Sequence, residues 1–180
     1  MTKPKITLDA NAIINHYDRA HASPTSVPEL EEIMRRWETD EIDVAITTRI
    51  EADLWQDKDK ARRDAMLAKA EVLPIIGSVF RFGFSKLDDA DGLMSDEHVD
   101  LAKQVEHILS PAGIDPQANT FPNKISDVDH LVGHKLAARD VFVTDDGKLN
   151  KKAADLAGIG IKVMRPSEAL VEIDRILKGP

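Results

Sequence analysis

The stretch Lys5-Ile6-Thr7-Leu8-Asp9-Ala10-Asn11-Ala12-Ile13-Ile14 sets the organisation of the chain. An apolar, β-branched run ends at Asp9, Asn11 stands two residues later, and a helical apolar run begins there. A strand that leads directly into a helix is typical of an open α/β sheet, in which ligands gather at the carboxyl ends of the strands. Asp9 is therefore well placed for a functional site, although Asp is also among the best helix N-caps.

Strand-like and helix-like segments alternate along the rest of the chain. Further strands are predicted at 41–48, 71–76, 140–144 and 161–164. Helices are predicted at 11–20, 28–37, 49–55, 57–70, 95–109, 125–139, 148–157 and 166–177. The strand at 71–76 is predicted at a sheet edge, because Pro74 cannot donate a ladder hydrogen bond. The alternation favours an α/β fold, a three-layer α/β/α sandwich with a central, mostly parallel sheet.

The length of 180 residues predicts a single domain over 1–180. Residues 77–122 depart from the alternating pattern, and Phe80, Phe82 and Phe84 alternate within them as on one face of an extended segment. This region is interpreted as an insertion or lid on the main fold.

Composition narrows the class of protein. Lys and Arg number 24 against 32 Asp and Glu, and the net charge of −8 disfavours broad non-specific binding to DNA. A nuclease remains compatible with this balance, because acids at a metal site contribute to the total. The chain contains no Cys, which excludes disulfides and thiolate chemistry and fits a cytoplasmic location. No signal-peptide or membrane-spanning segment is recognised, so no membrane association is expected.

Four acids lie at strand ends or helix starts on what would be one edge of a parallel sheet: Asp9, Glu51, Asp129 and Asp146. Converging carboxylates repel one another unless a cation offsets their charge. Hard divalent cations such as Mg²⁺ or Mn²⁺ suit a cluster of oxygen ligands, and they can activate water against a phosphodiester. Each acid also has an ordinary alternative role, as a helix cap, an exposed helix residue or a turn residue.

The sequence resembles the PIN-domain family of metal-dependent ribonucleases. The resemblance rests on four stretches, which are Ile6–Ile14, Ile46–Ala52, Asp127–Val132 and Val141–Leu149. It implies that Asp9, Glu51, Asp129 and Asp146 are catalytic, metal-binding acids and that Asn11 and Thr144 are polar supports. Asp127 competes with Asp129, and Asp145 competes with Asp146, for a ligand position. Residues 77–122 match no part of the family pattern.

The resemblance implies an endoribonuclease in which Mg²⁺ or Mn²⁺ activates a water that attacks the phosphorus, and the 3′ oxygen leaves. The substrate is then RNA. Small members of the family are toxins of toxin–antitoxin pairs, so an antitoxin protein is an expected partner for that branch. The chain is longer than a minimal toxin, with the extra region between Glu51 and Asp129. A homodimer is compatible with the apolar helices but is not indicated by any one motif.

Three residues near the acids are candidates for substrate contacts: Arg49, His130 and Lys148. Lys148 directly follows the turn at Asp146, so it is placed to meet a phosphate backbone. His130 and His134 also have the i, i+4 spacing of a zinc pair, but no Cys or intervening Glu accompanies them.

Two rival functions follow from the same residues. A PIN-like fold without activity would serve as an interaction module, although degenerate members are expected to lose their acids. A small-molecule phosphatase also uses strand-end acids, and Asp9-x-Asn11 resembles the first strand of haloacid-dehalogenase phosphatases. Those enzymes usually carry a second Asp where this chain has Asn11.

Overall fold

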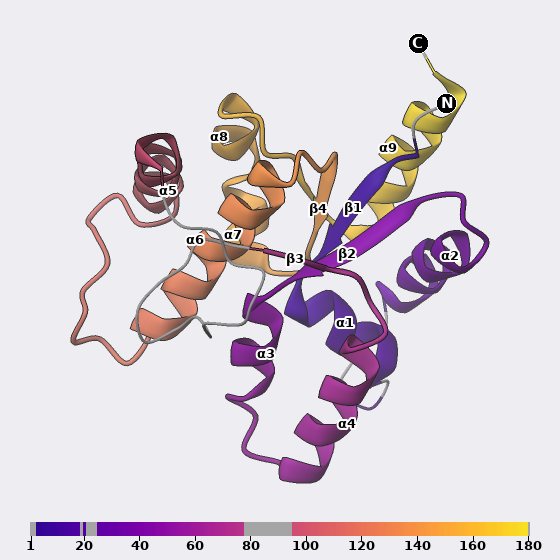
Figure 1. Cartoon of the computed structure of the whole chain (residues 1–180), viewed down its shortest axis with the longest axis horizontal. Coiled ribbons are helices and arrows are strands. Elements are labelled where there is room, and N and C mark those ends of the chain that lie inside the picture. Colours follow the sequence, from indigo (N-terminus) through magenta and orange to yellow (C-terminus); the bar gives the residue numbers. More distant parts are fainter. Residues whose placement is uncertain (1–2, 19, 21–24, 78–94, 180) are drawn as a thin grey trace.

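A computed structural model describes residues 3–18, 20, 25–77 and 95–179. Its central sheet has five parallel strands in the order β3-β2-β1-β4-β5 (Figure 1). The strands are β1 (Lys5–Leu8), β2 (Asp43–Thr47), β3 (Ile75–Ile76), β4 (Val141–Val143) and β5 (Val163–Met164). The predicted α/β fold with a parallel sheet is therefore confirmed, and β3 lies at a sheet edge as predicted from Pro74.

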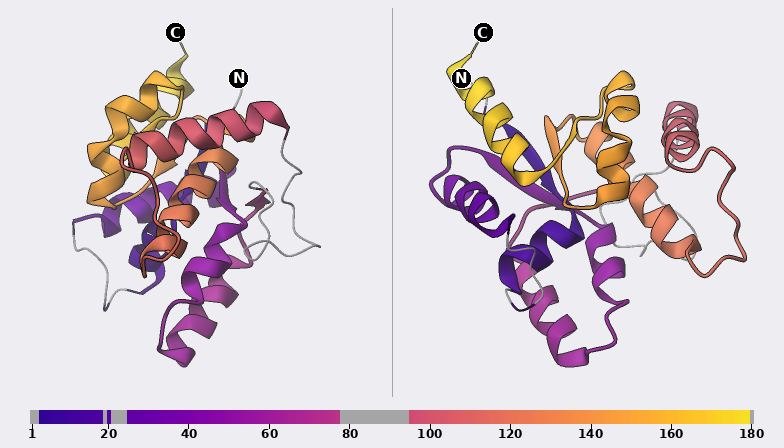
Figure 2. Two further views of the ribbon diagram at one scale, coloured as in Figure 1. Left: turned by 90° about the vertical axis from the view of Figure 1, so that its left-hand side faces the viewer. Right: turned by 180° about the vertical axis from the view of Figure 1, so that it is seen from behind.

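Helices cover both faces of this sheet. In chain order they are α1 (Ala10–Tyr17), α2 (Val27–Glu38), α3 (Arg49–Leu54), α4 (Lys60–Ala70), α5 (Asp96–Leu109), α6 (Phe121–Leu136), α7 (Gly147–Lys151), α8 (Ala153–Gly158) and α9 (Pro166–Lys178). Figure 2 shows α2 and α9 on one side of the strands and α5 to α8 on the other. This arrangement is the three-layer sandwich that the alternating pattern predicts.

β4 and β5 send alternate side chains into two separate cores, because successive side chains of a strand point to opposite faces. Ile6 and Leu8 of β1 pack with α1, α2 and α9, in a cluster that also holds Val141 and Val143. Phe142, between those two valines, packs instead against α6, α7 and α8. The opposite face of β1 presents Thr7, whose hydroxyl meets the ring of a histidine on α6.

Several predicted boundaries differ from the structure; for example, the strand predicted at 71–76 is only Ile75–Ile76. α6 begins at Phe121, earlier than predicted, with Pro122 in its first turn, where a missing N–H costs no helical bond. The helix predicted over 148–157 is divided into α7 and α8 at Lys152, whose N–H bonds to the carbonyl of Leu149 in a tighter turn. The alternating residues Phe80, Phe82 and Phe84 lie outside the described residues.

α5 is the described helix of the 77–122 region, and it packs on α6. Its buried residues Ala102 and Val105 join Val128 and Leu131 of α6 in the second core. The interpretation of 77–122 as an insertion or lid stays a prediction. None of the helices in the described ranges is both long and apolar enough to cross a membrane.

The strand order gives the sheet a defined ligand-binding edge. β1 lies between β2 and β4, so the chain leaves β1 toward one half of the sheet and later returns to the other half. At such a switch point the helices that follow neighbouring strands lie on opposite faces, and a crevice opens at the carboxyl ends of the strands. Asp9 follows β1 directly, and Thr144 follows β4 directly, so both stand at this crevice.

Candidate functional site

Asp9 is a buried carboxylate held by three hydrogen bonds. Its Oδ1 accepts from the backbone N–H of Ala10 at 2.7 Å, which makes it the N-cap of α1. Its Oδ2 accepts from Asn11 Nδ2 at 2.7 Å and from Thr144 Oγ1 at 2.6 Å. Asp9 is only 6% exposed. Asp9 is therefore both a helix N-cap and a candidate site residue. Its Oδ1 caps α1, and its Oδ2 accepts the hydrogen bonds from Asn11 and Thr144.

Asn11 ties the ends of β1 and β4 together. Its Nδ2 also donates to Thr144 Oγ1 at 3.1 Å, and its Oδ1 accepts from the backbone N–H of Asp145 at 3.0 Å. Thr144 Oγ1 in turn accepts from the N–H of Asp146 at 3.0 Å. These bonds fix the orientation of Asp9 across the switch point, a supporting role of the kind expected for Asn11 and Thr144.

The two acids after β4 have different surroundings. Asp145 accepts from Asn15 Nδ2 and from Ser26 Oγ, each at 2.7 Å, and so holds the start of α2 against the end of β4. Asp146 is the N-cap of α7 and accepts from the N–H groups of Lys148 and Leu149. Of these two carboxylates, Asp146 is the one whose charge acts on Asp127 at the crevice.

Asp53 and His130 complete the group around Asp9. His130 Nε2 lies 2.7 Å from Asp53 Oδ2, and its Nδ1 lies 2.5 Å from the hydroxyl of Thr47. Ser126 Oγ donates to the other oxygen of Asp53 at 2.6 Å. One ligand atom from each of Asp9, Asp53 and His130 lies within 4.8 Å of the other two.

Burial and mutual repulsion shift the pKa values of this group. Burial raises the pKa of Asp9 above its ordinary value, and the nearby charge of Asp53 raises it further. Asp127 is partly buried beside Asp9, Asp146 and Asp53, and burial followed by their negative charge raises its pKa to about 7. Burial alone would lower the pKa of His130, but the carboxylates, Asp53 foremost, raise it to about 9. The centre therefore concentrates negative charge that one imidazolium only partly offsets.

The Asp9–Asp53–His130 group can hold a divalent metal ion, and it is compatible with a metal-dependent hydrolase. The donors fit such an ion, because carboxylate oxygens suit Mg²⁺ and Mn²⁺ while an imidazole nitrogen suits transition metals. The raised pKa values of Asp9 and Asp127 point the same way, since a cation would relieve the repulsion that causes part of each shift.

Two acids predicted as ligands, Glu51 and Asp129, are not in this group among the described residues. Asp129 Oδ2 accepts from Arg49 Nε at 3.0 Å, in an ion pair whose side chains are 0% and 2% exposed. Glu51 accepts from the indole Nε1 of Trp55 at 3.2 Å and is not in the ligand group. Residues two apart on a helix point roughly 200° apart, so Asp53 and Asp127 take the crevice side and Glu51 and Asp129 do not. Arg49, an expected substrate contact, is consequently buried in the interior.

His134 does not join His130 in a shared site. Its Nδ1 lies 2.9 Å from Thr7 Oγ1, and its ring packs edge-on against Phe142 with centroids 5.7 Å apart. Burial lowers the pKa of His134 to about 3, and the charges of Arg139 and Lys135 contribute. The ring is therefore a neutral part of the core beneath the sheet.

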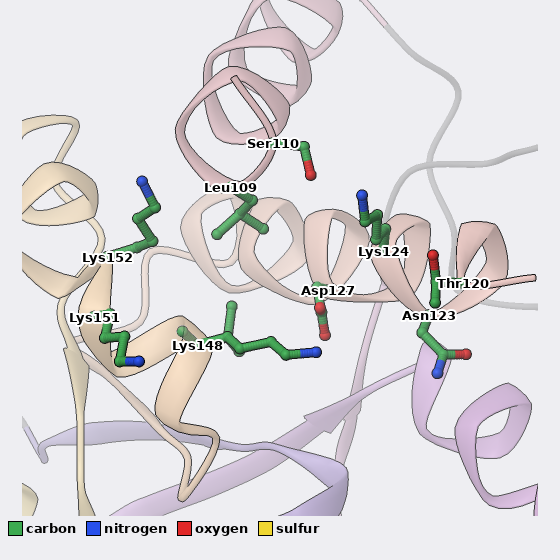
Figure 3. A pocket seen from close by; sticks show the side chains of 10 residues that line it. Leu109, Ser110, Thr120, Asn123, Lys124, Asp127, Lys148, Lys151 and Lys152 are labelled. Carbon is green, nitrogen blue, oxygen red and sulfur yellow. The ribbon is translucent and has the colours of Figure 1, made fainter. Parts of the chain in front are cut away.

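A cavity of about 350 Å³ opens next to the acids, between the end of α5, the first turns of α6 and α7 (Figure 3). Lysines from two helices line it: Lys124 comes from α6, while Lys148, Lys151 and Lys152 come from α7 and its end. Asp127 lies between them and belongs to both the cavity and the acid centre. Lys148, expected as a substrate contact, is thus placed on the cavity wall.

Asp53 and Thr47 are site residues that sequence reasoning did not single out. For α6, a signal was present in the sequence: Asp127 and His130 are three residues apart and so share one helix face. A comparison of the chain with models of known protein families found no match, and a comparison with curated proteins found none either.

Proposed function

We propose that the chain is a PIN-like, metal-dependent endoribonuclease that hydrolyses RNA phosphodiester bonds at the Asp9 centre. One observation carries the proposal. Ligand atoms of Asp9, Asp53 and His130 converge within 4.8 Å at the crevice of a parallel sheet, with Asp127 and Asp146 beside them. The resemblance of the Asp9-Ala10-Asn11 and Thr144-Asp145-Asp146 segments to the family supports the choice of ribonuclease.

The proposed ligands are Asp9 and Asp53 of the converging group and Asp127, which lies beside that group, with Mn²⁺ or Mg²⁺ as the ion. His130 is placed by its bond to Asp53 either to bind the ion through Nε2 or to orient the Asp53 carboxylate. A bound divalent ion would supply Lewis-acid activation of water and of the phosphodiester. Asn11 and Thr144 hold Asp9 in one orientation, so the carboxylate requires little rearrangement when the site is filled.

The test is cleavage of single-stranded RNA in Mn²⁺ or Mg²⁺, with EDTA as the metal-free control. Asp9→Asn and Asp53→Asn should each abolish cleavage, because each removes a charged ligand while keeping the shape of the side chain. Glu51→Gln is the matched comparison, since Glu51 lies two residues from Asp53 on the same helix but outside the ligand group. It should retain activity close to that of the wild type.

Cutting that survives both EDTA and Asp9→Asn would disprove the metal mechanism. Hydrolysis of p-nitrophenyl phosphate without RNA cleavage would instead identify the centre as a phosphatase. Absence of Mn²⁺ binding by calorimetry, with a folded protein, would favour an interaction module without catalytic activity.

A further inference from the structure

We infer that the lysine-lined cavity is a subsite for one unpaired nucleotide of the substrate strand, next to the phosphate that is hydrolysed at the acid centre. The inference rests on the proposed function, which it extends from the reacting bond to the strand that carries it. It assigns binding to Lys124, Lys148 and Lys151 and makes a single strand, rather than a duplex or a small phosphoester, the substrate.

The charge of the cavity is the first argument. The chain carries a net charge of −8, yet four lysines and one carboxylate supply the charged groups on this wall. Lys152 lies 3.9 Å from Asp155, a weak ion pair. Lys124, Lys148 and Lys151 form no ion pair with any residue in the described ranges, unlike Arg36 and others on the surface. Three lysines that border one hollow and form no ion pair among the described residues favour an anionic ligand there.

The size and chemistry of the walls are the second argument. A volume of about 350 Å³ lies at the lower end of small-ligand pockets, which suits one nucleotide and not a paired helix. Among the described residues, the lining includes polar side chains such as Asn123 and Thr120 and no aromatic side chain. Because this described lining offers no stacking surface, we expect the cavity to bind mainly the phosphate and sugar, and binding should depend little on which base is present.

The position of the cavity is the third argument. Asp127 lines it, and the carboxylate of Asp127 interacts electrostatically with Asp9, Asp53 and Asp146. His130, three residues further along α6, bonds to Asp53. A phosphate at the acid centre would therefore have its neighbouring nucleotide within the lysine-lined hollow, so one strand can occupy both.

The experiment measures binding separately from cleavage. A short fluorescein-labelled single-stranded RNA is titrated with protein in EDTA, and anisotropy gives the dissociation constant across a series of salt concentrations. The test variant is Lys148→Ala/Lys151→Ala. The control is Lys58→Ala/Lys60→Ala, which removes the same charge from exposed positions at the start of α4. Lys148→Arg/Lys151→Arg keeps the charge in the cavity.

Each phosphate contact on a single strand contributes a slope of about 0.7 to the logarithmic salt dependence, or roughly fivefold in affinity at 0.1 M salt. The Lys148→Ala/Lys151→Ala protein should therefore bind about 25-fold more weakly, with the slope reduced by about 1.4. The control pair should leave both quantities near those of the wild type, and the arginine pair should restore them.

Equal weakening by the two alanine pairs, or equal affinity for duplex and single strand, would overturn the subsite. Cleavage by Lys148→Ala/Lys151→Ala with an unchanged KM would also overturn it while leaving the nuclease proposal intact. If only Lys148→Ala/Lys151→Ala loses RNA binding, while the wild-type protein cuts no RNA with any metal, the subsite is supported and the nuclease proposal is rejected.

Discussion

Asp127 and Asp129 lie two residues apart on α6, and replacing each by Asn should change stability in opposite directions. Asp129 is fully buried against Arg49, whereas Asp127 faces other carboxylates at the crevice. We expect Asp129→Asn to lower the free energy of unfolding and Asp127→Asn to raise it in the absence of metal. The two variants together test whether Asp127 lies on the crevice side of α6 and Asp129 on its interior side.

The magnitude for Asp129 follows from its ion pair. Removing one partner of a buried pair takes away the opposite charge that offsets the other, which costs up to about 3–5 kcal/mol. The side chain of Arg49 is 2% exposed, so its guanidinium gains little solvation from water when the Asp129 carboxylate is lost. Arg49→Met/Asp129→Leu removes both charges and should recover most of that loss.

The magnitude for Asp127 follows from its pKa. The carboxyl group ionises near 3.8 when unfolded and near 7 in the folded protein. The folded state therefore retains a proton that the unfolded state loses, and stability falls as pH rises from about 4 to 7. The full shift would correspond to about 4 kcal/mol at 1.36 kcal/mol per pKa unit, and partial exposure reduces this to about 1–2 kcal/mol. Asp127→Asn should gain that amount at pH 8.

Urea denaturation at pH 8 in EDTA, followed by circular dichroism, measures both effects. With a denaturant slope of about 2 kcal/mol/M, the Asp129→Asn midpoint should fall by about 2 M, and the Asp127→Asn midpoint should rise by about 0.5–1 M. Saturating Mn²⁺ should then stabilise the wild type by about 2–3 kcal/mol but stabilise Asp127→Asn less, because the variant lacks a ligand. A stable Asp129→Asn protein together with a destabilised Asp127→Asn protein would refute the assignment.

Three further results are expected. In differential scanning calorimetry, Mn²⁺ should raise the melting temperature of the wild type but not that of Asp9→Asn or Asp53→Asn; an equal rise in all three would place the ion elsewhere. Thr144→Val should weaken Mn²⁺ binding about 10-fold in calorimetric titration, since it removes a hydroxyl donor to Asp9, whereas the exposed Thr39→Val should not. Between about pH 6.5 and 3, the stability of the wild type should fall with decreasing pH by up to about 1.4 kcal/mol per pH unit more than that of His134→Leu. The reason is that His134 takes up a proton in the unfolded state but not in the folded state. Parallel curves of stability against pH for variant and wild type would contradict this.

The fold was predictable because burial imposes a simple alternation on the sequence. Near-continuous apolar runs such as Val141–Val143 are typical of parallel strands covered on both faces, and Asp9 and Ser95 mark helix starts by their capping chemistry. The break at Lys152 was not predictable in the same way, because the residues on either side have good helix propensity and the division into α7 and α8 depends on packing.

The candidate site was only partly accessible to sequence reasoning. Asp9, Asn11 and Thr144 follow strands directly, so the strand positions alone place them at the crevice. Glu51 and Asp53 are harder to separate, because the buried residues Ile50 and Leu54 of α3 lie almost symmetrically between their directions. The choice between them depends on how α3 is rotated against α6, which is a tertiary property.

The cavity wall formed by α5 separates two tasks along the chain. The acids come from the ends of β1 and β4 and from α3 and α6, whereas Leu109 of the wall ends α5, and Ser110 and Thr120 belong to the segment between α5 and α6. We expect that segment to tolerate changes in sequence without displacing the acids, because the packing of Ala102 and Val105 holds α5 on α6 independently of it. A different segment grafted between Ser110 and Thr120 should therefore change the entrance of the lysine-lined cavity and leave the acid centre as it is.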